Sequence, residues 1–414
     1  MSTIALSDLL GTSVLDSTGQ VSGRVRDVVL SPRDDRIRVA GIIVKTRGGD
    51  LLLPAKLIAS YDLKGLRASS PSSEWQPFGA GEGVLLLSRD LLDQQIIDVH
   101  GRKVVRVNDV DLLEDHSNSH LDLKLSGVDV GARGALRRLL RGIVPASALR
   151  AMVNRIPPRV IPWEFVDLIE TDPARRVKLN IEHERLARLH PADIADIVEE
   201  LAPAEREAVF ETLDEHVAAE ALEEIDPKLQ VKIVESLEPE HAADIVEEMD
   251  PDAAADLLGD LPKETSEEIL GEMEPAEREE VEELLEFRED TAAGRMTTDY
   301  LAMGATATVS DAVETLKQFE GGIESVSTIY LLGEDARLEG AVPLARIVVS
   351  PPGTPLKQLA MEPLVSAHAG ANEKEVAELF DKYNLLTLPV VDDEGRMTGV
   401  ITADDIISLL RSKL

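Results

Sequence analysis

The sequence predicts a multidomain protein of α and β structure: two small β-barrels, an all-α superhelix of short helices, and a C-terminal α/β pair. Three observations predict this fold class. A strand-rich pattern near the N-terminus recurs 82 residues later, proline recurs every twelve residues across 191–286, and two similar segments of helices and strands end the chain. The length of 414 residues suits two to four domains.

Residues 1–73 are predicted to form the first barrel. Apolar, β-favouring runs at 25–30, 37–44 and 51–54 alternate with turn residues, which is typical of short strands. A stretch rich in Ser, Pro and Gly at 69–83 predicts a linker after them.

An internal duplication predicts a second barrel at 84–181. Nine residues are identical at the 82-residue offset. In the first copy they are Leu9, Leu10, Asp16, Gly19, Arg24, Val25, Asp27, Val28 and Leu30. A strand ending in Asp-x-x-Gly, followed by a Val-x-Asp-Val strand, resembles the PRC-barrel family. The resemblance implies an adaptor module that binds partners and has no catalytic role.

A basic insertion, 131–160, interrupts the second barrel. It holds seven arginines and no acidic residue. The arginines are Arg133, Arg137, Arg138, Arg141, Arg150, Arg155 and Arg159. Interleaved leucines make part of it a basic amphipathic helix. The sequence leaves two binding partners possible for this insertion. It either docks on the chain's own acidic superhelix or makes peripheral contact with an anionic membrane surface or another protein.

Residues 182–290 are predicted to form the superhelix. Proline stands at six of the eight twelve-residue steps, with Glu215 and Lys263 at the other two. Proline suits the first turn of a short helix, where its missing N–H has no intrahelical partner. Asp214, Asp226 and Asp250 stand at N-cap positions. The seventh, eighth and eleventh positions of each unit are apolar, which gives one stripe per helix. Eight such helices can stack stripe against stripe.

Negative charge is concentrated in the same region. Residues 191–286 contain 34 Asp plus Glu and 5 Lys plus Arg, a net of −29 in a chain of net −35. Phosphate would be repelled, so nucleic acid is excluded as a partner. The surface is either a solvated face or one that cations or a basic partner neutralise.

Composition excludes several other classes of protein. Cysteine is absent, which excludes disulfides and thiol catalysis, and no apolar run is long enough to span a membrane. The N-terminus lacks the features of a signal peptide, so a cytoplasmic location is expected. There is no P-loop, HExxH or Gly-x-Ser-x-Gly motif, and we predict that the chain is not an enzyme.

Two α/β segments, 291–352 and 353–414, complete the chain. Leu-Pro-Val-Val-Asp at 388–392 and Gly-Val-Ile-Thr-Ala-Asp-Asp at 399–405 resemble a CBS motif, and Met296-Thr297 marks a weaker first copy. The superhelix, with Leu-His-Pro-Ala-Asp at its head, resembles the N-terminal domain of MgtE magnesium channels. Residues 180–414 therefore resemble the cytosolic half of such a channel.

The resemblance implies Mg²⁺ held between acidic faces. Matched by position, the ligands are Glu220 and Asp252 in the superhelix and Asp405 in the second CBS copy. Carboxylates suit this hard cation. Asn372, Lys374 and Ser408 stand where the channel family has acids, which sets this sequence apart from the pattern.

A CBS pair also implies an adenine nucleotide. In the second copy Asp405 would bind the ribose and Thr402 would face the phosphates, while Thr387 and Pro389 line the base pocket. In the first copy proline and arginine, Pro343 and Arg346, replace the functional groups. Asp405 is thus assigned to both the metal and the nucleotide.

These features predict a soluble regulatory or sensor protein that binds Mg²⁺, an adenine nucleotide or both, and acts on a membrane transporter supplied by another chain. The alternative is a scaffold that holds protein partners through its barrels and superhelix, with vestigial ligand sites. A homodimer through the CBS pair is expected, because helices at 373–383 and 404–410 carry surplus apolar residues. The residues we name are Val376, Leu379, Phe380, Ile406, Ile407, Leu409 and Leu410.

Overall fold

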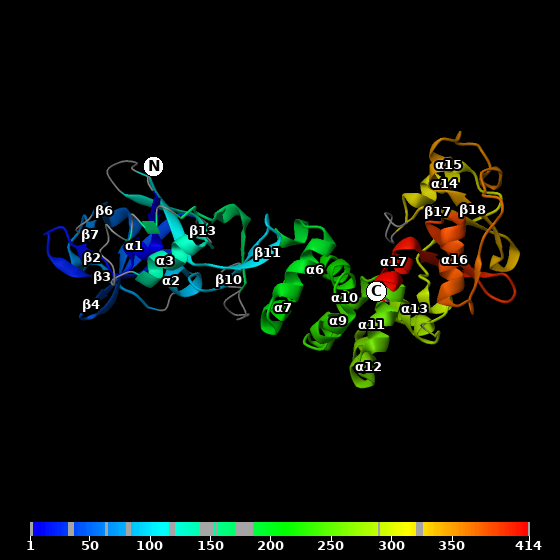
Figure 1. Cartoon of the computed structure of the whole chain (residues 1–414), viewed down its shortest axis with the longest axis horizontal. Coiled ribbons are helices and arrows are strands. Elements are labelled where there is room, and N and C mark those ends of the chain that lie inside the picture. The colour runs from blue at the N-terminus through cyan, green and yellow to red at the C-terminus, as the bar shows by residue number, and fades with distance from the viewer. Residues whose placement is uncertain are drawn as a thin grey trace. The chain divides into compact units, whose positions relative to one another are not determined.

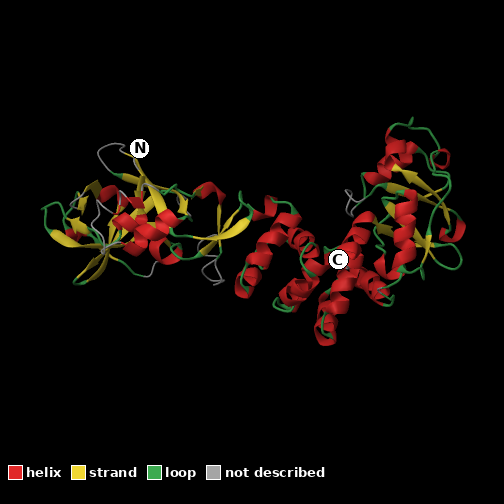
Figure 2. Ribbon diagram, viewed as in Figure 1, coloured by secondary structure: helices red, strands yellow, loops and turns green. Residues whose placement is uncertain are grey.

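The computed structural model describes residues 3–31, 37–62, 65–79, 84–115, 121–140, 149, 152–153, 156–169, 185–288, 290–319 and 326–412. The chain divides into two compact units, Met1–Ile225 and Asp226–Leu414, and each is described by itself. Strands dominate the start of the first unit, short helices follow, and the second unit ends in mixed structure (Figures 1 and 2). The predicted multidomain α and β architecture is confirmed.

The first repeat forms a strongly bent sheet in the order β6-β7-β2-β3-β4-β5-β8. Only β2 and β7 pair in parallel; the other neighbours are antiparallel. The strands are β2 (Ser13–Leu15), β3 (Val21–Leu30), β4 (Val39–Thr46), β5 (Gly49–Pro54), β6 (Ile58–Asp62), β7 (Gly65–Ala68) and β8 (Gln76–Pro77).

The second repeat forms two smaller sheets, β11-β10-β15 and β1-β12-β13-β14. Its own strands are β10 (Gln95–Asp98), β11 (Lys103–Arg106), β12 (Asp109–Asp115), β13 (Asp122–Asp129), β14 (Val160–Pro162) and β15 (Val166–Leu168). Strand β1 (Thr3–Ala5) comes from the start of the first repeat.

The two repeats exchange their first strand and helix. Strand β1, which leads into α1 (Leu6–Leu9), pairs with β12 of the second repeat. Strand β9 (Leu85–Leu86), which leads into α2 (Leu87–Asp90), pairs with β3 of the first repeat. One continuous apolar core, from Ile4 to Val166, fills both repeats. The two barrels therefore share one hydrophobic core, which the duplication in the sequence did not reveal.

The basic insertion docks on the second barrel. Helix α3 (Ala132–Leu140) approaches so closely at Gly134 that an added Cβ would lie 3.0 Å from the Cβ of Asp109. Arg137 Nη1 donates to Asp109 Oδ2 at 2.9 Å, and Arg138 Nη2 donates to Asp93 at 2.6 Å. Helix α3 therefore docks on the barrel and not on the acidic superhelix as predicted, because the buried carboxylate of Asp109 and the exposed carboxylate of Asp93 neutralise its guanidinium groups. Arg141, Arg150 and Arg155 lie outside the described residues.

Eight short helices follow, as the twelve-residue period predicts. In the first unit they are α6 (Pro191–Glu200), α7 (Pro203–Phe210) and α8 (Glu215–Glu223). In the second unit they are α9 (Pro227–Val234), α10 (Pro239–Glu247), α11 (Pro251–Asp260), α12 (Lys263–Glu272) and α13 (Pro275–Leu285). Helices pack on their next-but-one neighbours, α6 on α8, α9 on α11, α10 on α12 and α11 on α13.

The ends of these helices explain their spacing. Each proline of the period stands at the start of its helix, and the predicted apolar stripe is buried, as at Ile197, Val198 and Leu201. Asp226 caps α9 by accepting the Lys228 N–H at 3.1 Å. Asp214 and Asp250 occupy N-cap positions without a side-chain capping bond.

The C-terminal segments share one topology. In each, a parallel strand pair is extended by an antiparallel strand, β16-β17-β18 and then β19-β20-β21. The first comprises β16 (Leu301–Gly304), α14 (Val309–Leu316), β17 (Thr328–Leu332), β18 (Leu338–Pro343) and α15 (Leu344–Val348). The second comprises β19 (Ala367–His368), α16 (Glu373–Tyr383), β20 (Thr387–Val391), β21 (Met397–Thr402) and α17 (Ala403–Ser412).

The seven apolar residues assigned to a dimer face differ in burial, and Leu379 is half-buried. Val376, Phe380 and Ile406 are buried within the chain, so they need no second copy to cover them. Ile407 is 66% exposed and remains available. The side chains of Leu409 and Leu410 lie outside the described residues. Other exposed apolar residues of this unit are Val313, Val348, Val349, Tyr383 and Leu386.

Candidate functional site

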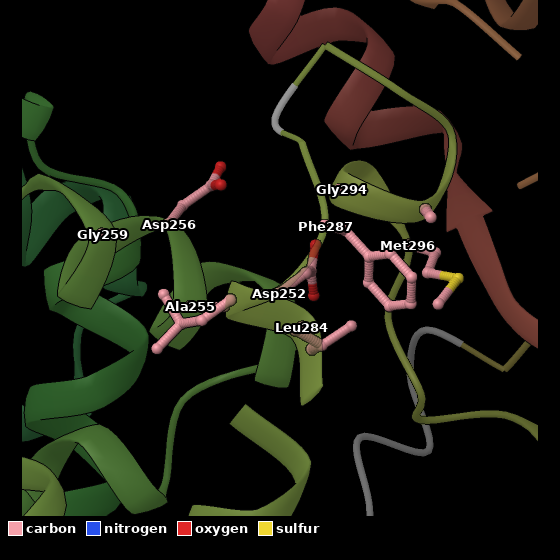
Figure 3. A pocket seen from close by; sticks show the side chains of 10 residues that line it. Asp252, Ala255, Asp256, Gly259, Leu284, Phe287, Gly294 and Met296 are labelled. Carbon is pink, nitrogen blue, oxygen red and sulfur yellow. The ribbon is translucent and has the colours of Figure 1, made fainter. Parts of the chain in front are cut away.

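The strongest concentration of unusual carboxylates lies in the second unit around Asp252. This residue stands in the first turn of α11, where the helix dipole favours a negative charge. It lines a cavity of about 80 Å³ with Asp256, Leu284, Phe287 and Met296. Figure 3 shows both aspartates projecting from α11. A carboxylate beside apolar groups is poorly hydrated, so this is a costly place for a charge.

Burial and neighbouring acids both raise the pKa of this group. Burial is the larger cause at Asp252, and the charges of Asp405 and Asp250 raise its pKa further. Burial likewise raises the pKa of Asp405 to about 6, with Asp404 and Asp250 contributing. The pKa of Asp299 is raised by burial, then by Asp250 and Glu280. Carboxylates of α11, α17 and the segment before β16 therefore form one interacting cluster.

The Asp405 carboxylate also accepts two hydrogen bonds from Thr402. Its Oδ2 accepts from the Thr402 N–H at 2.9 Å and from the Thr402 hydroxyl at 2.6 Å. Thr402 is paired across the strands with Thr387, whose hydroxyl accepts from Tyr330 at 2.8 Å. These bonds lower the pKa of Asp405, but burial outweighs them. Three of the four residues predicted to hold a nucleotide are thus adjacent, and the fourth, Pro389, is buried in β20.

Two of the three predicted metal ligands lie close together in the second unit, and the third belongs to the first unit. Asp252 and Asp405 interact electrostatically within the second unit. Glu220 lies on α8 of the first unit, where its exposed carboxylate is 3.6 Å from His216 Nε2.

The positions that depart from the channel pattern have local roles. Asn372 caps α16, because its Oδ1 accepts from the N–H groups of Lys374 and Glu375. The Lys374 ammonium is exposed and lies 3.7 Å from Glu378, one turn along the same helix. The side chain of Ser408 lies outside the described residues.

The first CBS copy has lost its equivalent polar groups. Arg346 occupies the position that matches Asp405, and its Nη1 donates to the carbonyl oxygens of Leu359 and Ala360, both at 2.9 Å. The guanidinium of Arg346 therefore holds the backbone at Leu359 and Ala360 in place through two hydrogen bonds.

Four members of the cluster were not predicted: Asp250, Asp299, Asp404 and Glu280. Asp250 had been interpreted as an N-cap alone. Asp404 precedes the predicted ligand Asp405 in the sequence, and this position could have indicated that it belongs to the cluster. Asp299 and Glu280 carry no local signal, because only tertiary packing brings Asp299 close to Asp250 and Glu280.

The chemistry of the cluster fits Mg²⁺. All the clustered groups present carboxylate oxygens, which this hard cation prefers. A divalent ion would remove the repulsion between them and favour their ionised forms. The cavity beside Asp252 has room for water, and Mg²⁺ usually keeps several of its waters in protein sites. No helix in the described part of the chain is long and apolar enough to cross a membrane.

Comparison with family models identifies three regions. Residues 1–72 match the PRC-barrel domain, residues 189–290 match the MgtE intracellular N domain, and residues 356–412 match the CBS domain. These matches confirm the predicted resemblances for those regions.

Individual relatives agree with the family models. The chain is 34% identical over 134 residues to the magnesium transporter MgtE of Thermus thermophilus, covering 32% of this chain and 30% of the transporter. It is 32% identical over 130 residues to that of Bacillus subtilis, covering 31% and 29%. The alignments with these curated relatives therefore span less than a third of their length.

Two solved structures each resemble a little more than half of this chain. The cytosolic domain of the Mg²⁺ channel MgtE in complex with ATP is 31% identical, with a TM-score of 0.53, over 56% of this chain and 94% of that one. The soluble part of a magnesium transporter is 27% identical with the same TM-score, over 56% and 91%.

Proposed function

This chain belongs to the family of the MgtE cytosolic domain, and from that premise we propose that it is a regulatory protein that senses Mg²⁺ and an adenine nucleotide. The observation that supports this proposal is the carboxylate cluster of Asp250, Asp252, Asp299 and Asp405. These side chains come from the superhelix, from the segment that follows it and from the second CBS copy. A ligand that neutralises them favours the state in which these parts are packed together.

Binding of Mg²⁺ would act by removing repulsion. Asp252 and Asp405 each carry a raised pKa, because burial and nearby carboxylates disfavour the charged forms. An ion with two positive charges offsets both effects, whereas monovalent salt only screens them. Asp252 and Asp405 are the proposed first ligands, with Asp250 and Asp299 close enough to contribute. Glu220 lies in the first unit, so it stays a separate prediction and is not assigned to this cluster.

The nucleotide would bind at the second CBS copy. Thr402 and Thr387 face each other across β20 and β21, and Asp405 is held by Thr402. Asp405 therefore belongs to both proposed sites, so that occupation of one changes the other. The first copy offers an arginine that is already engaged by backbone carbonyls, and we propose one nucleotide per chain.

The sensor would act on a transporter supplied by another chain. The match of residues 189–290 to the MgtE intracellular N domain supports a regulatory role at such a transporter. The barrels are the proposed attachment to that partner, and the CBS pair is the proposed homodimer interface. An anionic membrane surface could contact α3 through Leu139, which is 72% exposed.

Calorimetry on the full chain tests the proposal. MgCl₂, ATP, ADP and AMP are titrated into the wild type, into Asp252→Asn with Asp405→Asn, and into Asp260→Asn as a control. Asp260 is an exposed acid on the same helix, α11. We expect binding in the wild type and the control, and loss of Mg²⁺ binding in the double variant. If none of the four ligands binds to the wild type at millimolar concentration, the proposal is wrong.

A scaffold is the second candidate function. The engagement of Arg346 by the loop after α15 favours it, because a site closed in this way no longer needs a ligand. Partners captured by the full chain before and after addition of Mg²⁺ distinguish the candidates. Partners that are independent of Mg²⁺ favour the scaffold.

A further inference from the structure

The linker between the superhelix and the first CBS copy is bound to the second CBS copy. The N–H groups of Ala292 and Ala293 donate to carbonyl oxygens at 371 and 369, at 2.7 and 2.9 Å. Thr297 exchanges two backbone hydrogen bonds with Val400, at 2.8 and 2.9 Å. Both alanines are buried. The linker backbone therefore moves with the second CBS copy.

The side chain of Arg295, within this linker, reaches back to the superhelix. Its Nη1 donates to Asp256 Oδ2 of α11 at 2.7 Å. Its Nη2 lies 3.6 Å from Glu373 Oε1 of α16. The Nε atom is buried and has no hydrogen-bond partner. One guanidinium thus contacts a carboxylate from each side of the boundary between superhelix and CBS pair.

Charge explains why this contact matters. Without the guanidinium, Asp256 and Glu373 would be two like charges at one boundary, as Asp252 and Asp405 are. Asp256 is one helical turn from Asp252, on the same face of α11. The boundary between the superhelix and the second CBS copy therefore has two pairs of carboxylates, Asp252 with Asp405 and Asp256 with Glu373. The Arg295 guanidinium neutralises the second pair.

We propose that Arg295 is a built-in counter-ion that holds α11 on the second CBS copy when no divalent ion is bound. Arginine suits this role because its planar fork can engage two carboxylates at once, which a single ammonium group does less well. A divalent ion would then strengthen a contact that already exists. Only this last point depends on the proposed magnesium function.

Hydrogen–deuterium exchange on the full chain in EDTA provides the test. The variants are Arg295→Gln, Arg295→Lys and the control Arg278→Gln. Arg278 pairs with Glu282 within α13, so its loss removes the same charge without breaking a contact between domains. We expect exchange in α11 and at the start of α16 to be at least tenfold faster in Arg295→Gln than in the control. Arg295→Lys should lie between them, which keeps the test decisive if the glutamine variant folds poorly.

Addition of 10 mM MgCl₂ separates this inference from the function it extends. Partial recovery of protection in Arg295→Gln supports both. Equal exchange in EDTA for Arg295→Gln and Arg278→Gln overturns the role of Arg295, whatever Mg²⁺ does. If Arg295→Gln exchanges faster than Arg278→Gln in EDTA and Mg²⁺ changes the exchange rate of no variant, the role of Arg295 is supported and magnesium sensing is contradicted.

Discussion

Asp27 and Asp109 occupy equivalent positions in the two repeats, and each binds the helix that begins the other repeat. Asp27 accepts from the N–H groups of Ser88 and Arg89 at the start of α2, at 2.7 and 3.2 Å. Asp109 accepts from the N–H and the hydroxyl of Ser7 in α1, at 3.0 and 2.5 Å. The buried carboxylates therefore fix the exchange of strands between the barrels.

The exchange predicts a long-range effect of truncation. Deletion of residues 1–9 removes β1 and α1, so β12 loses one of its two strand partners and Asp109 loses two donors. We expect backbone hydrogen exchange to rise in β12 and β13 of the second repeat more than in β4 and β5 of the first. A rise confined to the first repeat would contradict the exchanged arrangement.

The substitution Asp109→Ala should destabilise the first unit by about 3 kcal/mol, because it removes the acceptor for Ser7 and leaves Arg137 buried without its partner. Asp62→Ala, at an exposed position, is the control.

The carboxylate cluster predicts a specific response to divalent ions. Millimolar MgCl₂ should raise the melting temperature more than NaCl at the same ionic strength, because a bound ion stabilises the folded state by about 1.4 kcal/mol at ten times its dissociation constant. Asp252→Asn with Asp405→Asn should remove the difference and keep the NaCl response. Equal effects of the two salts on the wild type would show that the acids are a solvated surface.

Protonation of Asp405 predicts how stability depends on pH. Its pKa is raised to about 6 in the folded protein from a usual value of 3.8, mainly by burial. The folded state therefore binds the proton more tightly than the unfolded state does. This contribution is complete below pH 4 and is lost as the pH rises through 6, which lowers the free energy of unfolding by on the order of 2 kcal/mol.

Thermal melts in EDTA from pH 4.5 to 7.5 measure this dependence. Burial also raises the pKa of Asp111 in the second barrel to about 6, so both groups contribute to the slope. Asp405→Asn should reduce the slope for the second unit, and Asp111→Asn should reduce it for the first. Mg²⁺ should stabilise at pH 7.5 and have little effect at pH 4.5. Stability that rises between pH 5 and 7 in the absence of metal argues against this assignment.

Exposed apolar residues predict how the CBS pair dimerises. Leu386 is 68% exposed and Ile407 is 66% exposed, and burial of both in an isologous interface would remove apolar surface from water. Light scattering should show a dimer for the wild type and a monomer for Leu386→Glu with Ile407→Lys. Val21→Lys, at an exposed position of the first barrel, should remain dimeric. A monomeric wild type at micromolar concentration rules the interface out.

Local signals account for what the sequence predicts correctly. The twelve-residue period and the apolar stripe predict each superhelix element, and the structure places one helix in each period. The short strands β16 and β19 carry no comparable signal, because a few residues show too little periodicity to be distinguished from a loop.

Long-range pairing accounts for what the sequence does not predict. The two repeats match at the same positions, so a duplication cannot reveal whether Ser7 binds Asp27 of its own repeat or Asp109 of the other. The arginines of α3 show the same limit: their positive charge predicts an acidic partner, but charge alone cannot select the barrel over the superhelix.

The shared barrel core also has a consequence for synthesis on the ribosome. Strand β1 leaves the ribosome early, yet its partner β12 follows more than a hundred residues later. Neither barrel can close until the second repeat has emerged, so the first strand must wait unpaired while its own repeat is already available. A nascent chain halted near residue 80 would therefore carry an open sheet edge at β3, where β9 of a neighbouring nascent chain could pair.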